Sequence, residues 1–209
     1  MVRKVPVQAR SVESMNRMLD AGEQLFYEGG SPALTLEAVI ERSQTSTGSF
    51  YARFGDMHGF FEAMHERVLG IIASEMVPLT AKAAAQPDLE SAILTLTKAA
   101  LGIADRHRAP VYFFAVGNSQ DETARSMGAQ FNLGGNDAFV VIVGSFLPDA
   151  SSAAAKRRID TAWRTILAAM FQHVMLDQSE VSRITMSQNV LATELAVMIS
   201  GYLRSIPAK

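Results

Sequence analysis

Short hydroxyl side chains gather at the start of one predicted helix, in the stretch TSTGSFYARFGD at residues 45 to 56. Such side chains can face water, hydrogen-bond a reacting substrate, or contact the edges of DNA bases. Gly48 within this stretch is a poor helix residue, because glycine costs about 1 kcal/mol relative to alanine there. A close approach to DNA backbone or bases would offset that cost.

Two helices are predicted ahead of this stretch. The first spans residues 11–28, with Ser11 as its N-cap and an end at Gly29-Gly30. The second spans residues 36–43, with Thr35 as its N-cap and a hydrophobic staple between the residues on either side of it. The apolar stripe expected on the first helix consists of Val12, Met15, Leu19, Gly22 and Phe26, and the staple of Leu34 and Val39.

The hydroxyl-rich stretch itself predicts a third helix over residues 46–54, after a break at 43–45 and before Gly55. Asp56 is a good N-cap for a fourth helix, which Pro78 is expected to end. The apolar stripe of that fourth helix comprises Phe60, Phe61, Met64, Val68, Ile71, Ile72 and Val77.

The remaining sequence predicts further helices and no convincing strand, although FVVIV at 139–143 is ambiguous. We therefore expect an all-α fold in two domains. Residues 1–56 form a small head, residues 57–77 a connecting helix, and residues 78–209 a larger helical domain. The helices expected in the larger domain cover 88–107, 109–117, 121–146 with an interruption at Gly134-Gly135, 152–177 and 187–205.

Composition sets limits on the kind of protein. The 209 residues are 48% hydrophobic and include no cysteine, which excludes disulfides, thiolate nucleophiles and cysteine-ligated zinc. No stretch has the roughly 18 apolar residues that a membrane span needs, and no signal peptide is apparent, so a cytoplasmic location is expected. The net charge of −2 does not announce a nucleic-acid partner, yet Arg3, Lys4 and Arg10 all precede the first acidic residue.

Two short helices joined by a tight break, with a third helix to cover them, match the arrangement of a helix-turn-helix DNA reader. Phe50 and Phe54 are four residues apart and should face the core of the head. Tyr51 and Arg53 point elsewhere and can reach phosphates, which fix the register on DNA. The helix N-terminus at Thr35 would add backbone donors for phosphate oxygens.

The run LTLEAVIERSQTSTGSFYARFGDMHGFFEAM resembles the DNA-binding head of the TetR family of bacterial transcriptional regulators. The likeness spans about residues 12–72 and is most specific between Leu34 and Phe61. Gln44 departs from the family pattern, which usually has glycine there, and this departure predicts a small strain or a different turn path. Met57 stands where a lysine commonly meets phosphate, which predicts a shallower salt dependence of binding.

The resemblance implies a regulator that binds a double-stranded, palindromic DNA operator, most commonly as a repressor, with no cofactor. Arg3, Lys4 and Arg10 could compensate for the missing lysine as a basic arm. The contacts that the resemblance implies are phosphate contacts from Thr35, Tyr51 and Arg53, and base-edge contacts from Thr47, Gly48 and Ser49.

A homodimer is expected, because one head covers only one half-site and the next lies about 34 Å away along DNA. Apolar stripes on the last two predicted helices could pair across a twofold axis into a four-helix bundle, although they could also pack within one chain. The candidate interface residues are Ile159, Trp163, Ile166, Val174, Leu191, Leu195, Met198 and Tyr202.

The middle helices are rich in aromatic and sulfur-containing side chains that suit a pocket for a small, mainly apolar effector, as the family resemblance implies. Plain core packing is the competing explanation for each of them. An effector that favours one dimer shape would release DNA through a tilt of the fourth helix. The candidate pocket residues are His107, Tyr112, Phe113, Met127, Phe131, Phe139, Met170, Phe171 and His173.

Two rival functions remain open. The sequence gives little support to an enzymatic function, because it has no nucleophile elbow and no phosphate-binding glycine loop. His58 and His65 lie about 10 Å apart along one helix, too far for one metal ion, and are expected to be exposed or at a rim. The second rival is a helical ligand-binding or adaptor protein whose DNA binding is impaired, a possibility raised by Gln44 and Met57.

Overall fold

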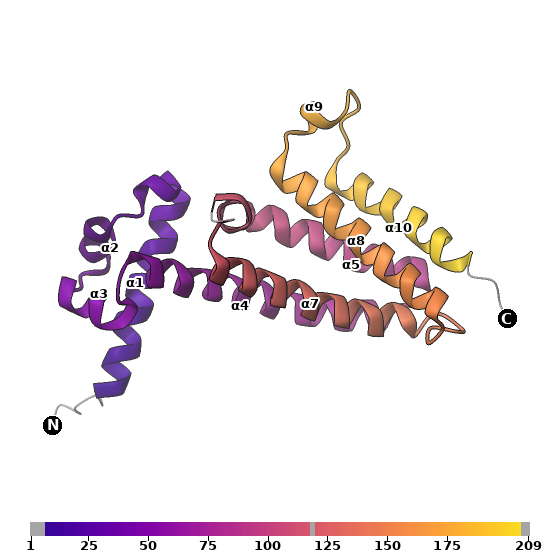
Figure 1. The fold of residues 1–209 in the computed structure, drawn as a ribbon. Coiled ribbons are helices and arrows are strands. Elements are labelled where there is room, and N and C mark those ends of the chain that lie inside the picture. The colour runs from indigo at the N-terminus through magenta and orange to yellow at the C-terminus, as the bar shows by residue number, and fades with distance from the viewer. Residues whose placement is uncertain (1–6, 118–119, 206–209) are drawn as a thin grey trace. The chain divides into compact units, whose positions relative to one another are not determined.

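The computed structural model describes residues 7–117 and 120–205, and every regular element in these ranges is helical (Figure 1). The all-α prediction is thereby confirmed, and FVVIV at 139–143 lies inside a helix. The chain divides into two compact units. The first comprises the chain through Leu69 together with Phe113–Arg125, and the second comprises Gly70–Tyr112 together with the chain from Ser126.

Three helices and a short 3-10 turn open the first unit: α1 (Val7–Gly29), η1 (Ser31–Ala33), α2 (Leu36–Ser43) and α3 (Thr47–Phe54). The bounds of α2 agree with the prediction, and α3 begins directly after its N-cap, Ser46. Asp56 caps the next helix as expected, because its carboxylate accepts a hydrogen bond from the Gly59 N–H at 2.9 Å.

The predicted start of α1 at Ser11 is wrong. The helix begins at Val7, since the intervening residues include no helix breaker, and Ser11 lies within it rather than at its cap. Val12, expected in the buried stripe, is 53% exposed, whereas Leu19 and Phe26 are buried. Met18 is also fully buried, so the buried face of α1 is centred on the second half of the helix.

A single apolar core closes the first unit. Phe50, Phe60, Met18 and Val39 are fully buried in it. Gly22 lets α1 approach the helix that carries Phe60 closely, because a Cβ at this position would lie 2.5 Å from the ring of Phe60. The core therefore depends on small residues as well as on large ones.

Helix α4 (Met57–Ala84) does not end at Pro78, contrary to the prediction. Proline removes one backbone donor, so the carbonyl of residue 74 loses its usual helical partner. The sequence that follows is rich in alanine, which favours helix, and Ala83 is fully buried in the core of the second unit. Propensity and packing together continue the helix, and Val77 is 67% exposed rather than part of a buried stripe.

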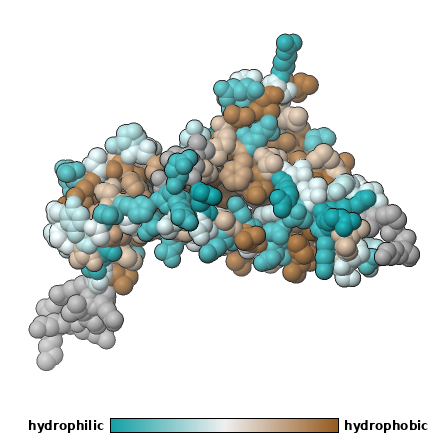
Figure 2. Space-filling view, viewed as in Figure 1, coloured by the Kyte–Doolittle hydropathy of each residue, from teal (hydrophilic) through white to brown (hydrophobic). Residues whose placement is uncertain are grey.

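The second unit is built on α5 (Leu89–Arg106), α8 (Ala153–Met175) and α10 (Gln188–Arg204), which pack against one another (Figure 1). Asp88, Ser152 and Ser187 are the N-caps of these helices. The bounds of the three helices agree with the predicted bounds to within two residues. Hydrophobic side chains also interrupt the hydrophilic surface over this unit (Figure 2). The connecting elements are α6 (Arg108–Tyr112), the π-helical turn η2 (Phe113–Gly117), α7 (Glu122–Gly144) and α9 (Gln178–Val181).

Helix α7 passes through Gly134-Gly135 without the predicted interruption. Gly135 has a packing reason, because a Cβ there would lie 2.8 Å from the ring of Trp163 on α8. The glycine pair was predicted to break the helix from its local propensity. The close approach of two helices explains one member of the pair instead.

Gly59 supplies a test of the head packing. A Cβ at Gly59 would lie 2.0 Å from the carbonyl oxygen of Phe54, a backbone atom that cannot rotate away. We expect Gly59→Ala to lower the free energy of unfolding by about 1–3 kcal/mol, the usual cost of overpacking. Thermal unfolding followed by circular dichroism measures the change.

Gly70→Ala is the matched control in the same helix, since a Cβ at Gly70 meets nothing within 4 Å. This variant should gain about 0.5–1 kcal/mol from the better helix propensity of alanine. Equal shifts in the same direction for both variants would contradict the close approach at Gly59.

Candidate nucleic-acid interface

The turn between α2 and α3 is held by local polar contacts. Thr35 caps α2 by accepting a hydrogen bond from the Ala38 N–H at 3.2 Å. At the other end of α2, Gln44 adopts a left-handed conformation with φ 53° and ψ 45°. Thr45 then folds back, since its hydroxyl oxygen lies 2.7 Å from that of Ser43. The expected strain at Gln44 is thus present, because left-handed backbone disfavours a residue that carries a Cβ.

The start of α3 presents small exposed residues. Ser46 caps the helix by accepting from the Ser49 N–H at 3.2 Å, and the two serine hydroxyl oxygens lie 2.9 Å apart. Thr47 and Gly48 are exposed, and Ser49 is half-buried. A Cβ at Gly48 would meet nothing within 4 Å, so the packing of the chain itself gives no reason for glycine here.

Aromatic rings anchor α3 from behind. The Phe50 ring is fully buried, with its centroid 5.3 Å from that of Phe60 and 5.1 Å from that of Phe54. Tyr51 is 49% exposed, and its ring is nearly perpendicular to that of Phe50 at a centroid distance of 5.9 Å. The helix therefore buries one face and leaves Thr47, Gly48 and Tyr51 accessible.

The basic residues predicted near DNA differ in their surroundings. Arg53 donates from Nη1 to the hydroxyl of Ser11 on α1, so it lies against the protein rather than standing free. Arg3 and Lys4 lie outside the described residues, and the side chain of Arg10 does as well. Met57, at the position where lysine is typical, is half-buried against the core of the first unit.

The two histidines of α4 differ in their surroundings. His65 is buried, contrary to expectation, and its ring stacks on Phe114 with a centroid distance of 4.2 Å. Burial lowers the pKa of His65, and the charge of Asp121 partly offsets this effect. His58 is exposed and lies 3.2 Å from the carboxylate of Asp121. The π-helical turn brings Phe114 and Asp121 to α4, and the sequence holds no local signal for that contact.

The fold as a whole resembles solved regulator structures. A TetR transcription regulator from Haloarcula marismortui superposes with a TM-score of 0.64 at 12% identity, over 91% of this chain and 97% of that chain. Salmonella enterica GusR gives a TM-score of 0.62 at 20% identity, over 91% and 95% of the two chains. A transcriptional regulator from Aquifex aeolicus gives 0.56 at 18% identity, over 93% and 99%. These likenesses establish the shared fold.

The sequence comparison addresses the head directly. Residues 18–64 match the family described as bacterial regulatory proteins, tetR family. This match identifies the head, residues 18–64, as similar to the DNA-binding heads of TetR-family regulators. The match covers the α2–turn–α3 segment, and the family that it describes consists of regulatory proteins, so the comparison gives the enzyme alternative no support. No curated protein matches the chain by sequence.

The described part of the chain contains no group of three His, Cys, Asp or Glu side chains arranged to hold a metal ion. None of the helices in residues 7–117 and 120–205 is both long and apolar enough to cross a bilayer.

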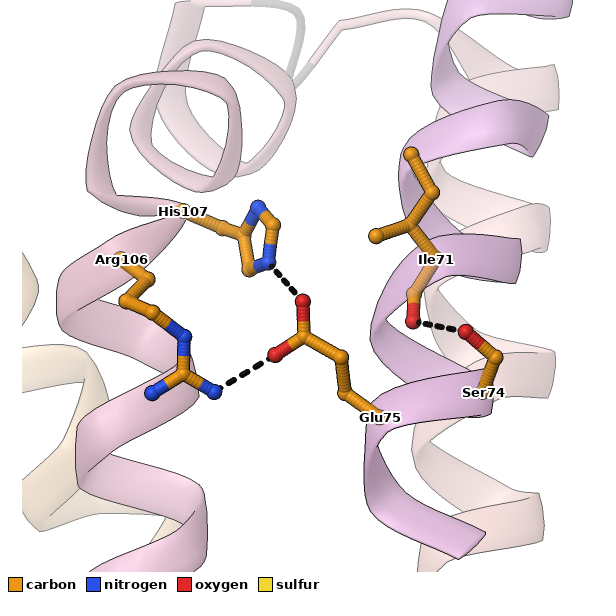
Figure 3. Close-up of polar contacts among 5 residues, drawn as sticks. All are labelled: Ile71, Ser74, Glu75, Arg106 and His107. Atoms are coloured by element: carbon orange, nitrogen blue, oxygen red, sulfur yellow. Dashed lines mark hydrogen bonds and ion pairs between the residues drawn. The ribbon is translucent and has the colours of Figure 1, made fainter.

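A charged cluster joins α4 to the end of α5 in the second unit (Figure 3). The Glu75 carboxylate accepts from Arg106 Nη2 at 2.6 Å, and its other oxygen lies 2.9 Å from His107 Nε2. These hydrogen bonds, first from Arg106 and then from His107, lower the pKa of Glu75. The effector candidate His107 thus has a carboxylate partner in its own chain.

The other effector candidates fall in both units. Phe113 belongs to the first unit, where its ring lies 5.3 Å from Phe26 and 5.8 Å from Phe61. Phe139 is buried in the core of the second unit beside Trp163, and Tyr112 is 47% exposed. Half-buried positions in the second unit are occupied by Met127, Phe131, Met170, Phe171 and His173, whose role in ligand binding stays a prediction.

The dimer candidates separate by burial. The side chains that lie inside the core of their own chain, and so are not available to a partner without opening it, are Ile159, Ile166, Val174 and Leu195. Met198 and Tyr202 on α10 are 54% and 40% exposed, while Trp163 and Leu191 are half-buried. Only the exposed and half-buried members stay predictions for a contact surface.

The strained turn yields a test of the head. Gln44→Gly removes the Cβ at a left-handed position, so we expect it to stabilise α2 and α3 by about 0.5–1 kcal/mol. Native-state hydrogen exchange of the α2 and α3 amides measures the gain. Gln44→Ala keeps a Cβ and serves as the control without relief. A loss of protection in Gln44→Gly would mean that the left-handed turn is not strained.

Proposed function

We propose that this protein is a homodimeric transcriptional repressor that binds a palindromic operator and releases it when a small, mainly apolar effector binds. We also propose that it acts in the bacterial cytoplasm. The observation that carries the DNA-binding role is the exposed start of α3, where Thr47 and Gly48 stand in front of a fully buried Phe50.

The absence of a side chain at Gly48 supports the DNA-binding role. The position is helical and open, so alanine would fit and would favour the helix by about 1 kcal/mol. A requirement from outside the chain explains the glycine better than the packing does. DNA bases or backbone in van der Waals contact with Gly48 would meet that requirement.

The remaining head contacts divide by chemistry. Thr47 can contact base edges, and the Ser49 hydroxyl can do so while it stays oriented by Ser46. Tyr51 is exposed enough to reach a phosphate, and the N-terminus of α2 at Thr35 offers backbone donors. Arg3, Lys4 and Arg10 remain our proposed basic arm.

A dimer places two heads on two half-sites. Operator half-sites one helical turn apart require recognition helices about 34 Å apart, a spacing that one head cannot span. Exposed apolar side chains on α10, namely Val197, Met198 and Tyr202, support a contact between two copies there. Such a contact would be isologous, with α8 and α10 of each chain in one four-helix bundle.

We assign DNA binding to residues 1–56, a connecting role to 57–77, and effector binding and dimerisation to 78–209. Helix α4 contributes residues to both compact units without a break. A change in its tilt on effector binding would shift the dimer between a DNA-binding and a released form. The coupling expected of such a switch is about 1–3 kcal/mol, or roughly 5- to 150-fold in affinity.

Selection of bound sequences from random duplex DNA tests the DNA-binding role. We expect enrichment of a palindrome, with Gly48→Ala binding it at least tenfold more weakly because a methyl group would occupy the contact. The same variant should be as stable as the parent or more so, because the Cβ meets open space. A destabilised Gly48→Ala would overturn the argument from open packing. Absence of any enriched sequence at low salt would favour the ligand-binding or adaptor alternative.

Effector control is tested with ligands found by thermal-shift screening. Saturating ligand should weaken binding to the selected operator at least fivefold, the lower end of the coupling given above. The effect of ligand on operator affinity is then compared in two variants. Tyr112→Ala, at a proposed pocket residue, should reduce this effect, and Val141→Ala, at a 73% exposed side chain outside the proposed pocket, should leave it unchanged. Equal operator affinity with and without ligand would refute the regulatory switch.

A further inference from the structure

We propose that Arg53 is a positioning residue that sets the orientation of α3 on α1, and that it is not the phosphate contact that the sequence predicts. The inference rests on the proposed function in one respect only, because orientation of α3 matters for DNA binding. The tie between the helices can be measured without DNA.

The contact joins two helices far apart in sequence. Arg53 Nη1 donates a hydrogen bond to the Ser11 hydroxyl oxygen, across 42 positions of the chain. Both helices belong to the first unit. Ser11 lies inside α1 and is half-buried, so its hydroxyl faces α3 instead of capping its own helix.

The rest of the guanidinium is poorly placed for a phosphate. Arg53 Nε is buried and has no hydrogen-bond partner. Bidentate recognition of a phosphate needs two N–H groups on one edge of the guanidinium. Burial of Nε removes the edge formed with Nη2. The bond to Ser11 uses one of the two N–H groups of Nη1 and holds the guanidinium against α1, so a phosphate could meet only the N–H groups that remain on Nη1 and Nη2.

A directional contact between α1 and α3 fixes a property of α3 that apolar packing leaves free. The rings of Phe50 and Phe54 hold α3 by apolar contact, which fixes how deeply the helix is buried but is weakly directional. A hydrogen bond from a charged donor is directional and stronger than a neutral one. The Arg53–Ser11 bond therefore fixes the rotation of α3, on which the direction of Thr47 and Gly48 depends.

Three variants of the full chain test the tie: Ser11→Ala, Arg53→Met and the double variant. Ser14→Ala in the same helix is the matched control, because Ser14 is not the residue that bonds Arg53. Affinity for the selected operator is measured at several salt concentrations. Hydrogen exchange of the amides at residues 50–54 is measured without DNA.

We expect Ser11→Ala and Arg53→Met to weaken operator binding to a similar extent, about five- to tenfold. The double variant should be no weaker than either single variant, since one interaction is lost in all three. The slope of log affinity against log salt should stay as in the parent. Both single variants should speed exchange at residues 50–54, and Ser14→Ala should leave all these quantities unchanged.

A phosphate contact predicts the opposite pattern. Arg53→Met would then reduce the salt slope by about 0.9 per head, and Ser11→Ala would bind DNA as the parent does. That result overturns the positioning role. If the parent binds no DNA sequence, the proposed function fails. The hydrogen-exchange rates still test the Arg53–Ser11 contact in that case, and unchanged rates in both single variants overturn the positioning role.

Discussion

Helix α3 depends on the burial of Phe50. An isolated helix as short as α3 is unstable in water, so tertiary contact must hold it. Full burial of one phenylalanine ring contributes about 1.5–3 kcal/mol, and here the ring rests on Phe60 from α4. Phe60 reaches that place because Gly22 and Gly59 leave room for helix approach on α1 and at the start of α4. The exposed polar face of α3 is therefore held in place by the buried apolar face that carries Phe50.

Features decided by neighbours in sequence were predictable. The caps at Thr35 and Asp56 each join groups three residues apart, so residue type and spacing are sufficient to find them. The bounds of α2 and the composition of the Phe50 anchor follow for the same reason. Predictions failed where a helix breaker was judged by propensity alone, because packing around Ala83 and Trp163 supports helix through Pro78 and Gly135.

Contacts between distant segments could not be predicted from one sequence. Nothing local tells that Ser11 meets Arg53, or that the turn at Phe113–Gly117 covers His65. Burial within the chain likewise removes Ile159 and Val174 from the set of side chains that a partner could touch, although their spacing matches that of an interface stripe. Periodicity identifies an apolar face, and the fold alone decides what covers it.

The electrostatics of the first unit explain why fit at Gly48 carries so much of the proposed recognition. Arg42 pairs with Glu28 at 2.7 Å, Arg67 bonds Asp20, and Arg53 bonds Ser11, so these three arginines of the first unit have partners within it. Met57 adds an apolar contact in place of a cation. Charge neutralisation of phosphates gives affinity without sequence preference, whereas contact with base edges gives preference. Because Arg42 and Arg53 are held by partners within the head, recognition depends more on close contact through α3, and a glycine with open space before it permits close contact.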